Sequence, residues 1–296
     1  MSYLLGLILW LCGFGPPSDA PASVEEGGAV VIPIDGAAEG PPLPAITPAR
    51  GDNPPLVVID AGHGGRDPGA PGAVPGLQEK DVTLAIARAM RDELAASGRV
   101  RVALTRDDDS FIPLEQRYAI ARRMGADLFV SLHADAAESN NTARGATIYT
   151  LSEVASDAEA AALAQRENAV DAVGGVAMSD DANVNLILID LAQRESMAVS
   201  ADFARILHRE AGPLITFQRD WHRFAAFIVL KAADVPSILF EAGYVSTEED
   251  ARFLTSPEGR RAIATGMRRA IEAHFSRRFL DARPDAAQAN GSSPAR

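Results

Sequence analysis

Apolar runs alternate with amphipathic repeats through most of this chain, and the alternation predicts its secondary structure. Unbroken apolar runs of four to eight residues are typical of strands that are buried on both faces. Apolar residues spaced by three or four positions predict helices with one buried face. We therefore expect strands at 56–59, 99–104, 127–135, 145–151, 224–230 and 236–240, and helices at 79–94, 114–124, 156–173, 185–208, 246–254 and 257–279.

The order of these elements predicts the fold class. Strands and helices alternate from residue 56 onward, and such connections are right-handed crossovers between parallel strands. We expect an α/β fold, with one domain over residues 55–280 and a mainly parallel, twisted sheet flanked by helices. With 47% apolar residues in 296, the chain is long enough for a substantial core.

Residues 152–185 interrupt this alternation. The helix expected at 156–173 has a thin apolar face, formed by little more than Leu163, Val170 and Val173. A helix with so little apolar surface cannot pack tightly on a core. We interpret the segment as an insertion that either decorates the surface or docks reversibly.

The start of the chain resembles an export signal. The apolar run at 3–14 is too short for a comfortable membrane span but suits a signal peptide, and small residues follow it at 20–22. We expect residues 1–22 to be a signal peptide or membrane-targeting segment, with a periplasmic protein and no stable membrane span after processing. The only cysteine, Cys12, would leave with the signal, which suits an oxidising compartment.

Two further segments have compositions typical of disorder. Residues 23–54 are rich in Pro, Gly and Ala and predict a linker, while 281–296 form a polar tail. The chain has 28 basic and 40 acidic residues, for a formal charge of −12, and no basic stripe. We therefore expect no binding to nucleic acid.

Polar side chains stand where three buried strands end. His63, His133 and Glu241 each occupy such a position, and Glu79 begins the helix after the first strand. In a parallel sheet these positions converge on one edge. Two imidazoles and one carboxylate with an open fourth position are typical of catalytic zinc, and a further carboxylate can act as general base. Taken singly, His63 could be a solvated turn residue and Glu79 a favourable charge at a helix N-terminus.

Four ordered motifs carry a resemblance to a known family. They are Ile59-Asp-Ala-Gly-His-Gly-Gly-x-Asp-Pro-Gly-Ala70, Glu79-Lys80, Ser131-Leu-His-Ala-Asp135 and Pro236-Ser-Ile-Leu-Phe-Glu241. With these motifs, residues 56 to about 278 resemble the zinc-dependent N-acetylmuramoyl-L-alanine amidases, and more narrowly the cell-separation amidases of Gram-negative bacteria.

The resemblance implies an activity and a set of site residues. It makes His63, Glu79 and His133 the Zn²⁺ ligands and Glu241 the catalytic base. The reaction implied is hydrolysis of the amide between N-acetylmuramic acid and L-alanine in peptidoglycan, during wall remodelling and daughter-cell separation.

The resemblance also implies regulation by the inserted segment. In the similar enzymes a helix covers the zinc until an activator displaces it, and Glu167 resembles the residue that reaches the metal. An ordinary exposed glutamate on a helix is the alternative. The partner implied is a LytM-type activator protein. Similar enzymes often carry an N-terminal wall-targeting domain, whereas about 30 linker residues precede the catalytic domain here. Septal targeting is therefore doubtful or delegated to a partner.

Other residues are candidates for supporting roles. Asp60 and Asp135 could orient the imidazoles, although buried capping would explain either one equally well. Trp221 and His222 are expected in a loop that could touch the substrate.

Two alternative functions remain open from the residues. A zinc carboxypeptidase-like enzyme would need an arginine to hold a free carboxylate, and Arg66 and Arg117 are available. A wall-binding pseudoenzyme is disfavoured because it would have no need to retain all four metal and base positions.

Overall fold

The computed structural model describes residues 42–137, 143–173 and 186–281. The expected signal segment at 1–22, most of the linker at 23–54, the second part of the insertion and the tail from 282 lie outside these ranges. Within the linker, Thr47 pairs with Val102 through two backbone hydrogen bonds of 2.8 and 3.1 Å.

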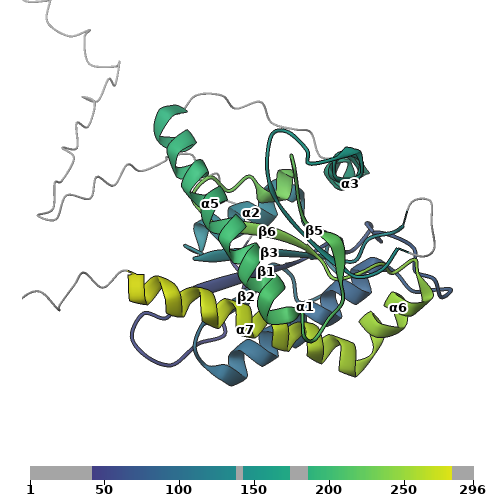
Figure 1. Cartoon of the computed structure of the whole chain (residues 1–296), viewed down its shortest axis with the longest axis horizontal. Helices are drawn as coiled ribbons and strands as arrows, with labels where there is room; N and C mark the ends of the chain where they lie inside the picture. The colour runs from purple at the N-terminus through teal and green to yellow at the C-terminus, as the bar shows by residue number, and fades with distance from the viewer. Residues whose placement is uncertain (1–41, 138–142, 174–185, 282–296) are drawn as a thin grey trace, which may run out of the picture. The chain divides into compact units, whose positions relative to one another are not determined.

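Six strands form one sheet, with the spatial order β2-β1-β3-β6-β4-β5 (Figure 1). The strands are β1 (Leu56–Ala61), β2 (Arg101–Leu104), β3 (Leu128–His133), β4 (Ala146–Leu151), β5 (Phe217–Ala225) and β6 (Ser237–Glu241). The first four in spatial order are mutually parallel. β4 runs antiparallel to β6 and parallel to β5. The α/β fold with a mainly parallel sheet is therefore confirmed, with a reversed pair of strands at one edge.

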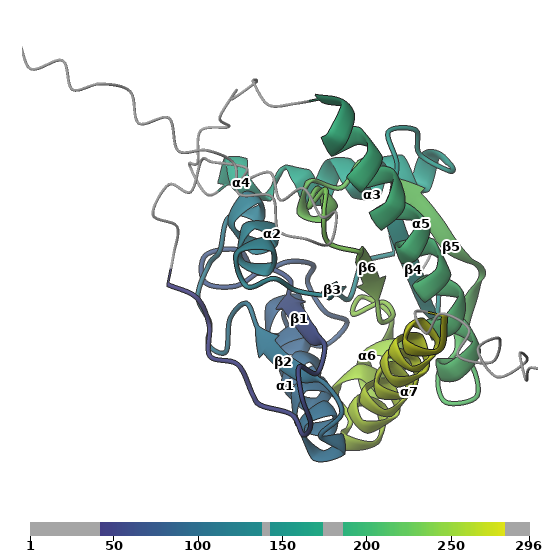
Figure 2. The ribbon, with the colours of Figure 1, turned by 90° about the vertical axis from the view of Figure 1, so that its left-hand side faces the viewer.

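Helices cover both faces of the sheet (Figure 2). They are α1 (Glu79–Ser97), α2 (Leu114–Arg123), α3 (Ala158–Asn168), α4 (Val170–Val173), α5 (Leu186–Ala211), α6 (Glu248–Thr255) and α7 (Pro257–Asp281), with a 3₁₀ turn η1 (Ile228–Leu230). One core joins the sheet to α1, α5 and α7, and the other joins it to α2, α3 and η1. Because both faces are covered, every residue of β1, β3 and β6 is buried.

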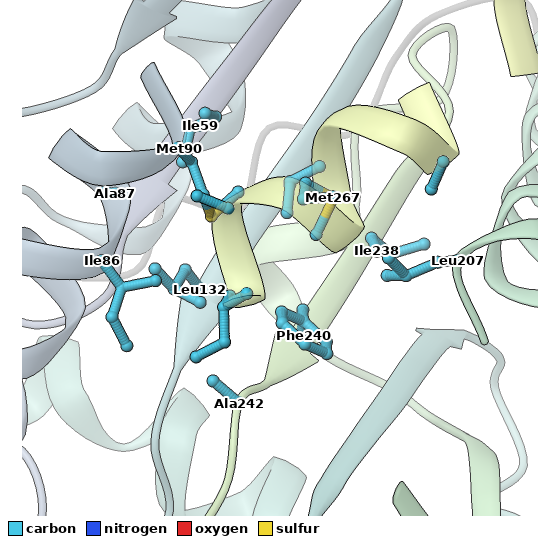
Figure 3. Close-up of a cluster of buried hydrophobic side chains, with 14 of the residues drawn as sticks. Ile59, Ile86, Ala87, Met90, Leu132, Leu207, Ile238, Phe240, Ala242 and Met267 are labelled. Atoms are coloured by element: carbon cyan, nitrogen blue, oxygen red, sulfur yellow. The ribbon is translucent and has the colours of Figure 1, made fainter. Parts of the chain in front are cut away.

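The first core shows how the sequence pattern becomes packing. Ile86 and Met90 of α1, one helical turn apart, point toward the sheet and toward Met267 of α7 (Figure 3). Gly98 then ends α1 in the left-handed conformation (φ 65°), with its N–H donating to carbonyls of the last turn. Since α1 is fixed in this way, its first residue is fixed at the edge of the sheet.

The prediction of a strand at 224–230 is wrong in the strand's position. The strand is β5, which ends at Ala225, and the apolar residues after it form η1. Ile228, Val229 and Leu230 are buried against α2 rather than in the sheet. An apolar run indicates that a segment is buried but not which backbone conformation it has. A 3₁₀ turn under a helix can be as buried as a strand.

Two helical predictions also differ in detail. The helix expected at 156–173 is divided into α3 and α4. The helix expected at 185–208 is α5, and it packs on the core through its later turns around Phe203 and Leu207, whereas Leu191 is 63% exposed. In the part of the chain that the structure describes, no helix combines the length and apolarity needed to cross a membrane.

Candidate metal centre

His63 lies in the loop that follows β1, and its backbone is in the left-handed region with φ 60°. This conformation costs a non-glycine residue about 1–2 kcal/mol, so the surrounding structure must impose it. Its Nδ1 lies 2.7 Å from Oδ2 of Asp67. Because a carboxylate only accepts hydrogen bonds, Nδ1 carries a proton, and the other ring nitrogen, Nε2, faces the remaining site residues.

Two glycines allow the site residues to approach one another. A Cβ on Gly62 would lie 2.5 Å from Cε1 of His133. A Cβ on Gly69 would lie 2.6 Å from Oε2 of Glu79 and 2.7 Å from Cδ2 of His63. Gly62 and Gly69, on either side of His63, are therefore needed for the close packing of the cluster as well as for the turn.

His133 is the last residue of β3, and it stands in register with Glu241 at the end of β6. Its Nδ1 lies 3.2 Å from Nε2 of His63, with the two rings nearly perpendicular at 79°. Both nitrogens therefore face the same small space. The predicted convergence of strand ends on one edge is confirmed for these residues.

Glu79 is the first residue of α1 and is 2% exposed. Its Oε2 lies 3.0 Å from Nε2 of His63, and its Oε1 lies 3.3 Å from Nδ1 of His133. Backbone N–H groups of Ala70 and Ala134 donate to these two oxygens at 2.9 and 2.8 Å. The carboxylate is thus held in one orientation against both imidazoles.

Glu167 reaches the same space from the last turn of α3. Its Oε2 lies 3.6 Å from Nε2 of His63 and 3.4 Å from Nδ1 of His133. The side chain is buried, and Oε2 has no hydrogen-bond partner among the described residues. The alternative of an ordinary exposed glutamate on a helix is therefore wrong.

Glu241 is buried beside this cluster. Its Oε2 accepts a hydrogen bond of 2.9 Å from the backbone N–H of Asp135. Its Oε1 is buried and has no hydrogen-bond partner within the described ranges. One oxygen is anchored and the other is available to a proton.

The electrostatics show an excess of buried negative charge. Burial raises the pKa of Glu241, and the carboxylates of Asp135, Glu79 and Glu167 raise it further, well above its ordinary value. Burial also raises the pKa of Asp135 to about 7, with Glu79 and Glu167 adding to it against Arg166. Burial lowers the pKa of His63, but Glu79 and Glu167 outweigh it and hold that pKa well above normal. A buried cation at this point would relieve the repulsion.

The donor set fits a divalent metal. His63, His133 and Glu167 each offer one ligand atom, and these atoms lie within 4.8 Å of one another. Glu79 lies in contact with both imidazoles. Nitrogen and carboxylate donors with two orphaned oxygens close by match the preferences of zinc.

The orienting residue of His63 escaped the sequence analysis. Asp60 accepts hydrogen bonds from Thr105, Ser131 and Arg117, and none joins it to an imidazole among the described residues. Asp67 orients His63 instead, and its position four residues after the histidine in the same motif is the signal that could have identified it.

Asp135 and the aromatic pair also have other roles than those expected. The carboxylate of Asp135 pairs with Arg166, and its N–H donates to Glu241. Trp221 and His222 lie in β5, not in a loop. Trp221 stacks on His208 with ring centroids 4.1 Å apart, so one face of its ring is already used.

Comparison with known sequences identifies the same region of the chain. A sequence profile of the N-acetylmuramoyl-L-alanine amidase family (Amidase_3) matches residues 57–273. That range runs from β1 into α7 and contains His63, Glu79, His133, Glu167 and Glu241.

Individual relatives agree with the profile. The N-acetylmuramoyl-L-alanine amidase AmiC of Escherichia coli O6:H1 is 38% identical over 226 residues, which make up 76% of this chain and 54% of that protein. The N-acetylmuramoyl-L-alanine amidase AmiA of Salmonella typhimurium is 39% identical over 222 residues, covering 74% of this chain and 76% of that protein. The chain thus spans about half the length of AmiC and about three quarters of that of AmiA.

A solved structure shares the fold. The N-acetylmuramoyl-L-alanine amidase AmiC2 of Nostoc punctiforme superimposes with a TM-score of 0.54 at 30% identity, over 76% of this chain and 99% of that one.

Proposed function

Because the chain belongs to the N-acetylmuramoyl-L-alanine amidase family, we propose that it hydrolyses the amide between N-acetylmuramic acid and L-alanine in peptidoglycan. The observation that carries the proposal is the cluster of His63, Glu79 and His133 with Glu241 buried beside it. Residues 55–280 would form the catalytic domain, acting in wall remodelling and daughter-cell separation.

The cluster would hold Zn²⁺ through Nε2 of His63, Nδ1 of His133 and the carboxylate of Glu79. When bound, zinc polarises an amide carbonyl and lowers the pKa of a water molecule to roughly 7. Asp67 keeps the proton of His63 on Nδ1, and the two backbone N–H groups on Glu79 keep its carboxylate in place. These contacts fix two of the three donors, His63 and Glu79, before substrate arrives.

Glu241 would move the proton. Its Oε1 accepts a proton from the attacking water while Oε2 stays anchored on the N–H of Asp135. A carbon–oxygen bond forms at the lactyl carbonyl, the carbon–nitrogen bond breaks, and Glu241 returns the proton to the departing alanine nitrogen. The products are the carboxylate of N-acetylmuramic acid and a free amino group on the stem peptide.

Glu167 would keep the enzyme in an inactive state. Its carboxylate lies between the two imidazoles, in the position that water and the substrate carbonyl need. Contacts on either side hold it there: Arg166 pairs with Asp135, and Asn168 accepts from the N–H of Ile228 at 2.9 Å. A partner that draws α3 away would open the site.

The test uses the full chain with zinc and dye-labelled peptidoglycan. We expect slow dye release from the wild type and an increase of at least severalfold in Glu167→Ala, because that change removes the blocking carboxylate. Adding Glu241→Gln to Glu167→Ala should abolish release by at least a hundredfold while zinc still binds, because the amide cannot take up the proton. Gln165→Ala, at an exposed position on the same helix, is the matched control for the first change.

Product analysis decides between this activity and its alternative. Release of intact stem peptides with a free N-terminal alanine supports the amidase. Release of single amino acids from the peptide end would support the carboxypeptidase-like reaction. Zinc binding without any product, in Glu167→Ala as well as in the wild type, would support the pseudoenzyme. The contacts of Arg117 speak against the peptidase, since its guanidinium is buried and engaged with Asp60 and backbone carbonyls.

Export and partners complete the proposal. The apolar run at 3–14 supports export to the periplasm, where peptidoglycan lies. Glu167 lies on a separate helix that is held in place partly by polar contacts. Such a helix is one that a second protein could draw away, and this supports an activator, for which we propose a LytM-type protein.

A further inference from the structure

Two arginines hold the backbone of the loop that carries His63. Arg106 donates from Nε to the carbonyl of Ala61 at 2.9 Å and from Nη2 to that of Gly62 at 2.8 Å. Arg117 donates from Nη1 to the carbonyl of Ala61 at 2.9 Å and from Nη2 to that of His63 at 2.8 Å. Three consecutive carbonyls are therefore fixed by two planar guanidinium groups.

Both guanidinium groups are deeply buried. Arg106 is 3% exposed and Arg117 is 1% exposed. Arg117 has a buried counterion, since its Nη1 lies 2.9 Å from Oδ1 of Asp60. Arg106 forms no ion pair within the described ranges, and its hydrogen-bond partners are backbone carbonyls and the hydroxyl of Thr83. Burying a cation against carbonyls is costly, so the contacts need a reason beyond charge pairing.

The conformation of His63 supplies one reason. Its left-handed backbone is strained for a residue with a side chain, and the hydrogen bond from Arg117 to its carbonyl fixes the following peptide plane. Together with the bonds to Ala61 and Gly62, this sets the direction in which the imidazole leaves the loop. Relaxation of the loop would turn Nε2 away from His133.

Arg106 also connects this loop to the helix that carries Glu79. Its Nη2 donates to the carbonyl of Lys80 at 3.0 Å, in the first turn of α1. Thr83 of the same helix donates to the carbonyl of Gly62 at 2.9 Å. One guanidinium therefore joins the two segments that place His63 and Glu79 in contact.

We propose that Arg106 and Arg117 are positioning residues that fix the ligands of the metal site without touching metal or substrate. The inference rests on the proposed metal site of His63, Glu79 and His133, and it is independent of which amide the enzyme cleaves. Lysine cannot replace either arginine, because a single ammonium group cannot bridge two carbonyls in a fixed plane.

The test measures metal binding by the full chain, not turnover. Arg106→Lys and Arg117→Lys keep the charge and should weaken zinc about tenfold or more, measured by competition with a chromogenic chelator. The visible absorption bands of the cobalt-substituted protein should also change, because they report ligand geometry. Arg122→Lys is the matched control on α2, since Arg122 is at the surface and pairs with Asp234.

A milder variant keeps the test decisive if a lysine variant does not fold. Thr83→Val retains the shape but removes the hydroxyl that contacts Gly62 and Arg106, and we expect it to weaken zinc severalfold. Variants that lose unfolding stability yet bind zinc and cobalt as the wild type does would overturn the proposal. A Glu167→Ala variant that binds zinc tightly but releases no stem peptides would refute the proposed function and leave this inference standing. A wild type that binds no metal would refute both.

Discussion

The carboxylate of Asp67 decides which nitrogen of His63 is available. The 2.7 Å contact to Nδ1 places the proton there and aims Nε2 at His133 and Glu79. Without that contact the ring could rotate or change tautomer. A neighbouring carboxylate also strengthens the imidazole as a ligand.

The expected effect of removing this carboxylate follows directly. Asp67→Ala should weaken zinc binding by about 10–100-fold, the usual effect of losing such an orienting partner. Chelator competition on the folded variant measures the change. Asp92→Ala removes an exposed carboxylate that pairs with Arg91 and is expected to leave the affinity unaltered. Equal affinities in the two variants would show that Asp67 has no orienting role.

At the scale of elements, α3 and α4 are held by polar contacts on both sides as well as by packing. Ala160, Leu163 and Ala164 of α3 pack against the sheet, which is a modest apolar surface. Oδ1 of Asp171, in α4, accepts a 3.0 Å hydrogen bond from the N–H of Leu114 and so caps α2, whose preceding residue provides no side-chain cap. A small apolar contact with a few polar contacts is typical of an element of low local stability, which the proposed inhibitory role of Glu167 requires.

The hydrogen bond between Asp171 and the N–H of Leu114, one of the contacts that hold α3 and α4, can be removed without changing the metal site. Asp171→Ala should remove about 1 kcal/mol, a typical value for a lost helix cap, and shift docking of α3 and α4 toward the open state about fivefold. Basal dye release should rise by about the same factor. Glu115→Ala, in the first turn of α2, is the control because this residue also favours the N-terminus of α2 but lies outside α4. A rise in dye release in both variants would point to damage to α2 instead of release of α3 and α4.

At the scale of the whole molecule, the sheet brings together segments that are distant in the sequence. Adjacent parallel strands β1, β3 and β6 end at the same edge, which places the loop of His63 next to His133 and His133 next to Glu241. The covering helices α1 and α3 add Glu79 and Glu167. A metal bound by His63, Glu79 and His133 would join the loop after β1, the end of β3 and the start of α1.

Metal binding should therefore stabilise the whole domain. At a zinc concentration 100 times the dissociation constant, linkage adds about 2.7 kcal/mol to the free energy of unfolding. For a domain of this size that corresponds to a rise in Tm of about 5–10 °C. Thermal unfolding with and without chelator measures it. His63→Ala should show no chelator effect, and a wild type with an unchanged Tm would contradict a metal site at the strand ends.

Much of the fold and four site residues could be predicted from local pattern. The buried strands contain short apolar runs, and the stripe through Ile86 and Met90 predicted α1 and hence the position of Glu79. His63, His133 and Glu241 were identifiable because polar residues directly after buried strands share one edge of a parallel sheet.

Other features could not be predicted, for physical reasons. The run at 224–230 gave the wrong element because apolarity reports burial and not backbone conformation. Trp221 was expected in a loop, whereas pairing of β5 with β4 places it in the sheet and its ring on His208. Both errors concern contacts with distant segments, which local periodicity does not contain.

By itself the sequence determined the alternation of strands and helices and the residues at the strand ends, because the spacing of apolar residues within a short segment is enough to predict each element. Only the tertiary structure decided that Asp67 orients His63, that Arg106 and Arg117 hold its loop, and that Glu167 stands between the imidazoles. These contacts depend on side-chain direction and on the approach of separate elements to within about 3 Å. Packing of the whole chain sets both.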